Sequence, residues 1–189
     1  MESLIGVLIG IGLSAASGLR VFVPLLGLSI AGHYGLVPLG DSFLWLASWQ
    51  AMLAFGVASL LEIGAYYIPW LDHALDALLA PAAAIAGTLM MASTLGDTSP
   101  LLKWSFALIA GGGVSTTVHF GMSALRAAVS LPTGGLANPA VSSGESIGAV
   151  IMTLLALLLA PVAFLVVLWM LYKIGKRLLM YGRNDHPKA

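Results

Sequence analysis

Five long apolar runs dominate this chain, and they constrain its fold more than any other feature. They cover residues 4–31, 45–67, 74–95, 103–130 and 146–172. A helix needs about 20 apolar residues to cross the hydrocarbon core of a membrane. Only 8% of the residues are charged, whereas a soluble domain carries about 25%. The sequence therefore predicts an all-α integral membrane protein with about five transmembrane helices.

The composition also excludes several classes of protein. Eight basic and eight acidic residues give a net charge of +0, which provides no basic face for nucleic acid. The chain has no cysteine, so thiolate metal sites, iron–sulfur clusters and a cysteine nucleophile are excluded. It contains no hydrolase, metalloprotease or nucleotide-binding motif. We predict no enzymatic activity, no metal and no cofactor, and a single transmembrane domain over 1–172 followed by a basic tail over 173–189.

The distribution of cations predicts the orientation, because Lys and Arg favour the cytoplasmic side of a membrane. Five of the eight lie in the tail: Lys173, Lys176, Arg177, Arg183 and Lys188. This predicts a cytoplasmic C-terminus. Counting back through five spans puts the loop 96–100 inside, in agreement with Lys103, and the loop 131–143 outside, where Arg126 disagrees. The N-terminus is then outside, or inside if the first run is two half-spans.

Two stretches rich in small residues indicate an internal repeat. Residues 12–17 (GLSAAS) align with residues 113–118 (GVSTTV), each near the centre of its run. Under the five-span count, the first and fourth runs have opposite directions. Interrupted helices at corresponding positions of such halves are typical of inverted-repeat transporters, whose sites lie near the bilayer midplane. This interpretation divides the chain into halves at 1–95 and 100–172, with interrupted helices one and four.

The hydroxyl groups of these stretches are candidates for a solute-binding site. They belong to Ser14, Ser17, Ser115, Thr116 and Thr117. The alternative is simple packing, because small residues let helices approach closely in lipid and a hydroxyl can bond to a carbonyl of its own helix. Two pairs with small-xxx-small spacing fit that alternative: Gly6 with Gly10, and Ala83 with Gly87.

Arg20 is the most informative charged residue, because it lies inside the first run. Burying a guanidinium there costs at least about 2.5–3.5 kcal/mol, so Arg20 needs a carboxylate, a water-filled cavity or an anionic ligand. Glu62, in the second run, is the expected partner if Arg20 only fixes helix packing. If the two do not meet, Arg20 would hold an anion and Glu62 would carry a proton. His119, in the fourth run, is another candidate for proton or ion coupling because imidazole titrates near neutral pH.

Acidic residues at the starts of two runs have more than one interpretation. Asp72, His73 and Asp76 open the third run, and Glu145 opens the fifth. We prefer to interpret the acids as N-terminal caps, because carboxylates are favourable at the positive ends of helix dipoles. Together they would otherwise form the active site of an enzyme acting on lipid headgroups. Glu145 could also pair with Arg126, since both are expected on the same side.

Four motifs resemble a known family. They are SAASGLRVFVPLL at 14–26, LGDTSP at 95–100, AGGG at 110–113 and TGGLANP at 133–139. The chain is similar, over nearly its whole length, to the bacterial multi-pass membrane family catalogued as domain of unknown function 4126. The resemblance implies a small, stand-alone protein of the bacterial inner membrane, and it implies no substrate.

These observations favour a small transporter or channel for an anionic or zwitterionic solute. Its site would lie near the midplane between the first and fourth runs, with Arg20 supplying charge and the hydroxyls a polar lining. The alternative is a non-catalytic scaffold or assembly protein in which Arg20 is a packing salt bridge, and a headgroup enzyme is least favoured. The expected partners are membrane lipids and the solute. No nucleic acid is expected, and the sequence is compatible with a homo-oligomer.

Overall fold

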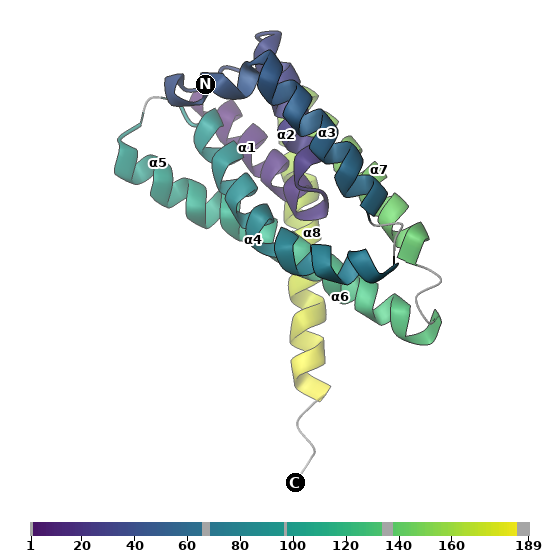
Figure 1. The fold of residues 1–189 in the computed structure, drawn as a ribbon. Coiled ribbons are helices and arrows are strands. Elements are labelled where there is room, and N and C mark those ends of the chain that lie inside the picture. The colour runs from purple at the N-terminus through teal and green to yellow at the C-terminus, as the bar shows by residue number, and fades with distance from the viewer. Residues whose placement is uncertain (1, 66–68, 97, 134–137, 185–189) are drawn as a thin grey trace.

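Helices are the only secondary-structure elements in the part of the chain that the computed structural model describes (Figure 1). The structure describes the backbone of residues 2–65, 69–96, 98–133 and 138–184, and the side chains of 4–65, 78–96, 98–129 and 139–177. Its elements are α1 (Glu2–Leu19), α2 (Phe22–His33), the 3-10 helix η1 (Asp41–Ala47), α3 (Trp49–Ala65), α4 (Pro69–Thr94), α5 (Pro100–Phe106), the π-helix η2 (Ala107–Gly112), α6 (Gly113–Thr133), α7 (Asn138–Leu158) and α8 (Ala160–Asn184). The predicted all-α class is confirmed.

Helix α1 is the centre of the bundle. It contacts α2, α4, α6, α7 and α8 (Figure 1). Every residue from 12 to 21 is buried, so this part of α1 has no face toward the surroundings. Its composition makes that position feasible, because residues 12–18 include two glycines, two alanines and two serines. Small side chains allow neighbouring helices to approach on all sides.

The first apolar run folds back on itself and is not one span. Its course is given by three contacts with α7: Leu19 with Gly148, Gly12 with Ala156, and Gly27 with Thr153. As residue numbers rise along α7, the contacting residues fall along α1, from Leu19 to Gly12, and rise along α2, from the turn to Gly27. The two helices therefore form a hairpin that turns at Arg20 and Val21, and the prediction of one span over 4–31 is wrong. Pro24 favours the break, because it has no N–H to bond to the Arg20 carbonyl.

The fifth run also folds back, between α7 and α8. A Cβ built on Gly12 would lie 2.7 Å from the Cβ of Ala156 and 3.2 Å from the Cβ of Ala163. In one continuous helix, the two alanines would be about 10 Å apart along the axis. Helix α8 therefore turns back along α7, and the prediction of one span over 146–172 is wrong. Pro161 lies just after the break, where its missing N–H costs no helical bond.

The bundle has two ends that differ in composition. We call one the ionic end: it holds the turn between α1 and α2, the last turns of α6 and the first turns of α7. We call the other the aromatic end: it holds η1 and the start of α5, where the rings of Phe43 and Trp104 lie 6.0 Å apart. The backbone N–H of Gly40 joins η1 to the end of α4 by bonding to the Ser93 carbonyl, with an N–O distance of 3.0 Å.

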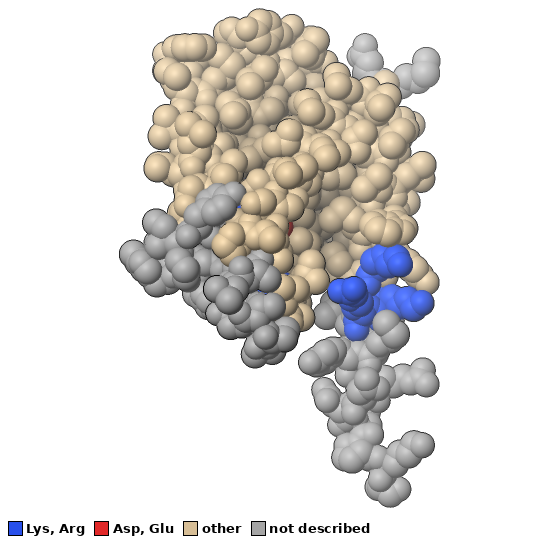
Figure 2. Space-filling model, turned by 90° about the vertical axis from the view of Figure 1, so that its right-hand side faces the viewer, with Lys and Arg blue, Asp and Glu red and all other residues tan. Residues whose placement is uncertain are grey.

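The two reversals change which loops share a side. Helix α8 runs toward the ionic end, where Ile174 packs against Gly121. Figure 2 shows basic side chains gathered where α8 leaves the body, and the described ones are Lys173, Lys176 and Arg177. The basic tail thus leaves at the end that holds the connection between α6 and α7, and away from the connection between α4 and α5. The predicted placement of loops 96–100 and 131–143 relative to the tail is wrong. Each of the first and fifth runs was counted as one crossing, whereas each contains a reversal.

The repeated stretches lie on helices that run in the same direction. Both helices are antiparallel to α4, as four contacts show: Gly10 with Met91, Ser14 with Gly87, Gly111 with Gly87, and Ser115 with Ala83. The predicted opposite orientation of the first and fourth runs is therefore wrong. The two interruptions also differ. The first run breaks after its repeated stretch, whereas the fourth is wound as the π-helix η2 just before its own.

Two described helices are long and apolar enough to cross a membrane. They are Pro100–Val129 and Pro139–Leu158. A third is obtained if η1 and α3, which meet at 60°, are taken as one bent span. Shorter apolar helices cover Leu4–Leu19, Phe22–His33 and Leu78–Thr94. The described residues thus indicate a membrane protein with two to three candidate spans.

Candidate functional site

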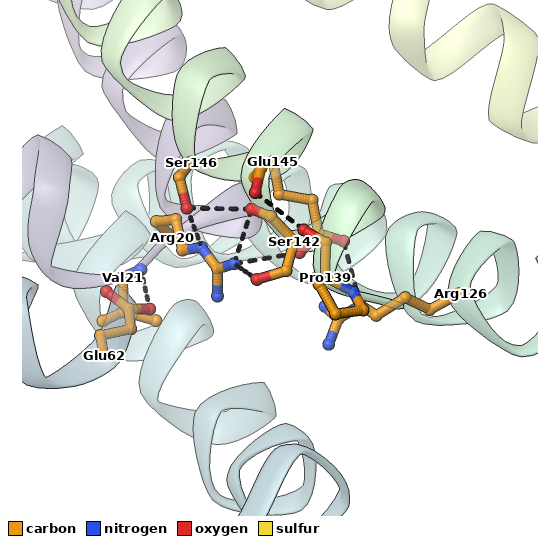
Figure 3. Close-up of polar contacts among 9 residues, drawn as sticks. Arg20, Val21, Glu62, Arg126, Pro139, Ser142, Glu145 and Ser146 are labelled. Atoms are coloured by element: carbon orange, nitrogen blue, oxygen red, sulfur yellow. Dashed lines mark hydrogen bonds and ion pairs between the residues drawn. The ribbon is translucent and has the colours of Figure 1, made fainter. Parts of the chain in front are cut away.

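Four charged side chains from distant parts of the sequence gather at the ionic end (Figure 3). Arg20 follows α1, Glu62 belongs to α3, Arg126 to α6 and Glu145 to α7. All four are buried, and Arg20, at 1% exposure, is the largest fully buried side chain among the described residues. Two positive and two negative groups give these four, which we call the ion cluster, a formal charge of zero.

The guanidinium of Arg20 is bound to the first turns of α7. Its Nε donates to the hydroxyl of Ser146 at 3.1 Å. Its Nη2 donates to the carbonyl oxygen of Ser142 at 3.0 Å and to the hydroxyl of Ser142 at 2.6 Å (Figure 3). The Ser146 hydroxyl also donates to the Ser142 carbonyl at 2.9 Å. Residues three and four apart share a helix face, so Ser142, Glu145 and Ser146 together present one polar face to Arg20.

Glu145 is shared by two arginines. Its Oε1 accepts a hydrogen bond from Nε of Arg126 at 3.0 Å, and its Oε2 lies 3.6 Å from Nη2 of Arg20. The sequence-based pairing of Arg126 with Glu145 is confirmed. The pairing of Arg20 with Glu145 was not predicted. The sequence feature that could have indicated it is the spacing of Glu145 and two serines, which places them on one helix face.

Glu62 caps the start of α2 across the helix break. Its Oε1 accepts a hydrogen bond from the N–H of Val21 at 2.7 Å, and its Oε2 accepts one from the N–H of Phe22 at 3.0 Å. The first N–H groups of a helix have no partner within it, and α2 has no cap from its own N-cap side chain. Arg20 attracts Glu62 electrostatically. The hydrogen bonds of Glu62 nevertheless go to the backbone, so the predicted packing pair is replaced by a cap.

Three of the predicted hydroxyls meet in the middle of the bundle, where α1, α4 and α6 touch. Ser14 donates to the Gly87 carbonyl at 2.9 Å. The hydroxyls of Ser17 and Ser115 lie 2.8 Å apart, and Ser115 donates to the Ala83 carbonyl at 2.7 Å. All three serines are fully buried. Their hydroxyls join helices to one another at backbone carbonyls.

The close helix contacts around these serines explain the glycines. A Cβ on Gly87 would lie 2.6 Å from the Gly111 carbonyl oxygen, and one on Gly111 would meet the Gly87 carbonyl oxygen in turn. A Cβ on Gly6 would meet the Thr94 carbonyl oxygen. The packing interpretation of the small-residue spacing is therefore confirmed. We call Ser14, Ser17, Gly87, Gly111 and Ser115 the serine–glycine core.

The remaining predicted residues lie outside both groups. Thr116 is half-buried, and Thr117 is exposed and donates to the Gly113 carbonyl of its own helix at 2.8 Å. His119 is buried, with its ring 6.1 Å from that of Phe120. The side chains of Asp72, His73 and Asp76 are outside the described residues. Within the described part of the chain, no three His, Cys, Asp or Glu residues are grouped as a metal site.

The ion cluster lies toward one end of the helices. Glu145 is six residues after Pro139, the start of a 20-residue candidate span, which is about 9 Å along the axis. Arg126 is seven residues before Thr133, where α6 ends, which is about 10 Å. Arg20 had been expected near the midplane, because the first run was counted as one span.

The comparisons with known proteins identify a family and nothing beyond it. The model of the family described as Domain of unknown function (DUF4126) matches residues 7–180, and the chain belongs to this family. No curated protein and no solved structure matches the chain.

Proposed function

We propose that this DUF4126 protein is a small membrane transporter or channel for an anionic or zwitterionic solute, with its site at the ion cluster. The observation that carries the proposal is that one buried carboxylate, Glu145, is shared by two buried arginines. Ionisable residues at membrane depth are costly, and they mark solute and ion pathways more often than they serve packing. The repeat gives no support, because α1 and α6 run in the same direction.

The shared carboxylate gives the site a means of exchanging anions. Glu145 lies between Arg20 and Arg126 as an internal anion. A solute carboxylate or phosphate that takes its place on Arg20 brings the same type of charge to the same planar donor. The contact of Glu145 with Arg20 is longer than its contact with Arg126, 3.6 Å against 3.0 Å. We therefore assign Arg20 as the solute-binding arginine and Arg126 as the residue that holds Glu145.

The orientation follows from the same end of the bundle. Arg126, Lys173, Lys176 and Arg177 lie at or beyond the ionic end, and Lys103 lies near Gly40 at the aromatic end. The excess of cations favours the cytoplasmic side for the ionic end. We propose that the C-terminus is cytoplasmic in a bacterial inner membrane, and that the solute site opens toward the cytoplasm.

Flux measurements in proteoliposomes test this function. Purified protein is reconstituted, and flux is measured with chloride, phosphate, acetate, glutamate and glycine as probes. We expect flux above that of protein-free vesicles for at least one probe. Arg20→Gln should lower it about tenfold or more, the factor that corresponds to a loss of about 1.4 kcal/mol. Thr117→Val is the matched control, because its hydroxyl bonds only within its own helix.

Stability must be measured in parallel, because Arg20 also binds α7. Arg20→Lys keeps the charge and loses the planar donor. It should therefore lower the flux strongly and the unfolding temperature only slightly. Flux that is absent for every probe, or that persists unchanged in Arg20→Gln, contradicts the proposal.

A second candidate is a non-catalytic scaffold, and the serine–glycine core favours it. The hydroxyls of Ser17 and Ser115 are fully buried and bonded to each other and to backbone carbonyls, as expected of a dry packing contact. In a scaffold, the ion cluster would fix helix positions only. Arg20→Gln and Glu145→Gln would then lower stability together, and no probe would show flux.

A further inference from the structure

An apolar groove lies between α2, α3 and α4, outside the ion cluster and the serine–glycine core. Its volume is about 250 Å³. Val21, in the turn before α2, and Phe22 and Leu25 of α2 form one wall, and Ala82 and Ile85 belong to the wall on α4. The groove exists because α2 and α3 pack closely against each other, whereas each touches α4 at few points.

The lining of the groove limits what can occupy it. Each lining residue is apolar apart from the indole nitrogen of Trp45. A charged or hydrogen-bonding ligand would lose its water there and find almost no partner, which is unfavourable. The volume is also at or below the lower limit of ordinary small-molecule sites, about 300 Å³, so the occupant is slim.

The surroundings of the groove identify the source of that occupant. Ile85 and Trp45 are 67% and 52% exposed at its rim. The outer face of α3 continues the apolar surface through Leu53, Val57 and Leu60, all of which are exposed. In a membrane protein such a surface faces lipid, so the groove opens to acyl chains rather than to water.

We propose that the groove between α2, α3 and α4 binds one acyl chain of a membrane phospholipid. A second copy of the protein fits less well, because a stable protein interface needs about 800 Å² from each partner and this groove is narrow. The chain would lie against Val21 and Phe22, whose N–H groups hold Glu62. It would thereby contact the turn that carries Arg20. The proposal does not depend on transport.

Photo-cross-linking tests the groove with the full chain. The protein is reconstituted in vesicles of phosphatidylethanolamine and phosphatidylglycerol that contain a phosphatidylethanolamine with a diazirine in its acyl chain. Labelled residues are mapped by mass spectrometry. We expect Ile85, Phe55 and Trp45 to be labelled more strongly than Leu60 and Ile109, although Leu60 and Ile109, at 74% and 75%, are more exposed.

Two variants of the same type sharpen the test. Ala82→Phe places a ring in the groove and should lower labelling of Ile85 about fivefold or more, because the ring must be repacked before a chain can enter. Ala124→Phe makes the same change at an exposed position of α6 and should leave labelling unchanged.

Two results would overturn the proposal. Labelling that follows exposure alone would show that the groove holds no particular chain, and this result needs no variant. Cross-links between two protein copies at the groove would assign it to a dimer contact.

Discussion

The ion cluster and the serine–glycine core are separated by one turn of α1, yet they solve the problem of burying polar groups differently. Ser17 bonds to its neighbour Ser115 and lies beside backbone carbonyls that are present in any helix. Arg20 needs side chains from another helix, and it obtains them from Ser142, Glu145 and Ser146 on α7. A hydroxyl can thus be buried wherever helices touch closely, whereas a guanidinium can be buried only where a distant segment supplies its partners.

The largest effect should come from removing the shared carboxylate. Glu145→Ala leaves two buried guanidiniums without the acid between them, and breaking a buried ion pair costs about 3–5 kcal/mol. Equilibrium unfolding in mixed micelles measures this loss. Ile147→Ala, an exposed change two residues away, is the control. A loss below about 1 kcal/mol for Glu145→Ala would mean that the cluster is solvated and that its burial has been misinterpreted.

A substitution in the serine–glycine core should destabilise the protein by steric overlap rather than by the loss of a charge. Gly111→Ala places a methyl group against the Gly87 carbonyl and must separate α4 from η2, at a cost of about 3 kcal/mol. Gly113→Ala has nothing within 4 Å of its new methyl group and should be neutral or stabilising by up to about 1 kcal/mol. Thermal unfolding of the pair compares them. Equal effects would contradict the close contact.

The Glu62 cap should show a smaller and more local effect. Glu62→Gln replaces one of the two acceptor oxygens by an NH₂ group, and hydrogen bonds to charged groups are worth about 1.5–3 kcal/mol. Hydrogen exchange of the Val21 and Phe22 amides should accelerate. The Arg20 amide bonds to the Ala16 carbonyl of α1 and should stay protected. Acceleration of all three amides together would indicate general unfolding instead.

The smallest effect concerns the hydroxyl pair. A double-mutant cycle of Ser17→Ala and Ser115→Ala should give a coupling energy of about 0.6 kcal/mol, the average for hydrogen bonds between membrane helices. A cycle of Ser17→Ala with Thr117→Val should give none, because Thr117 bonds only to Gly113. A coupling as large as the loss in Glu145→Ala would remove the distinction between the two regions.

The sequence predicted the members of these regions better than their geometry. Ser14, Ser17 and Ser115 were predicted to lie together, and they do, because small residues on apolar helices leave few other ways to pack. Arg20 was predicted to need a partner, and it has one. The choice of Glu145 over Glu62 could not be predicted, since it depends on the hairpins of α1–α2 and α7–α8. Thr117 could not be excluded either, because the side of α6 that faces outward was unknown.

What the sequence alone determined is the solvent and the class: apolar runs with 8% charged residues require a helical protein in lipid, and its small residues require close helix contacts. Only the tertiary structure decided the direction in which each helix runs through the bundle. Hydropathy averaged over a span-length window is the same for one long helix and for two short ones that turn back. Pro24 favours the turn at Arg20 locally, but its geometry is set by the carboxylate of Glu62 on the start of α2 and by the face of α7 that binds the guanidinium.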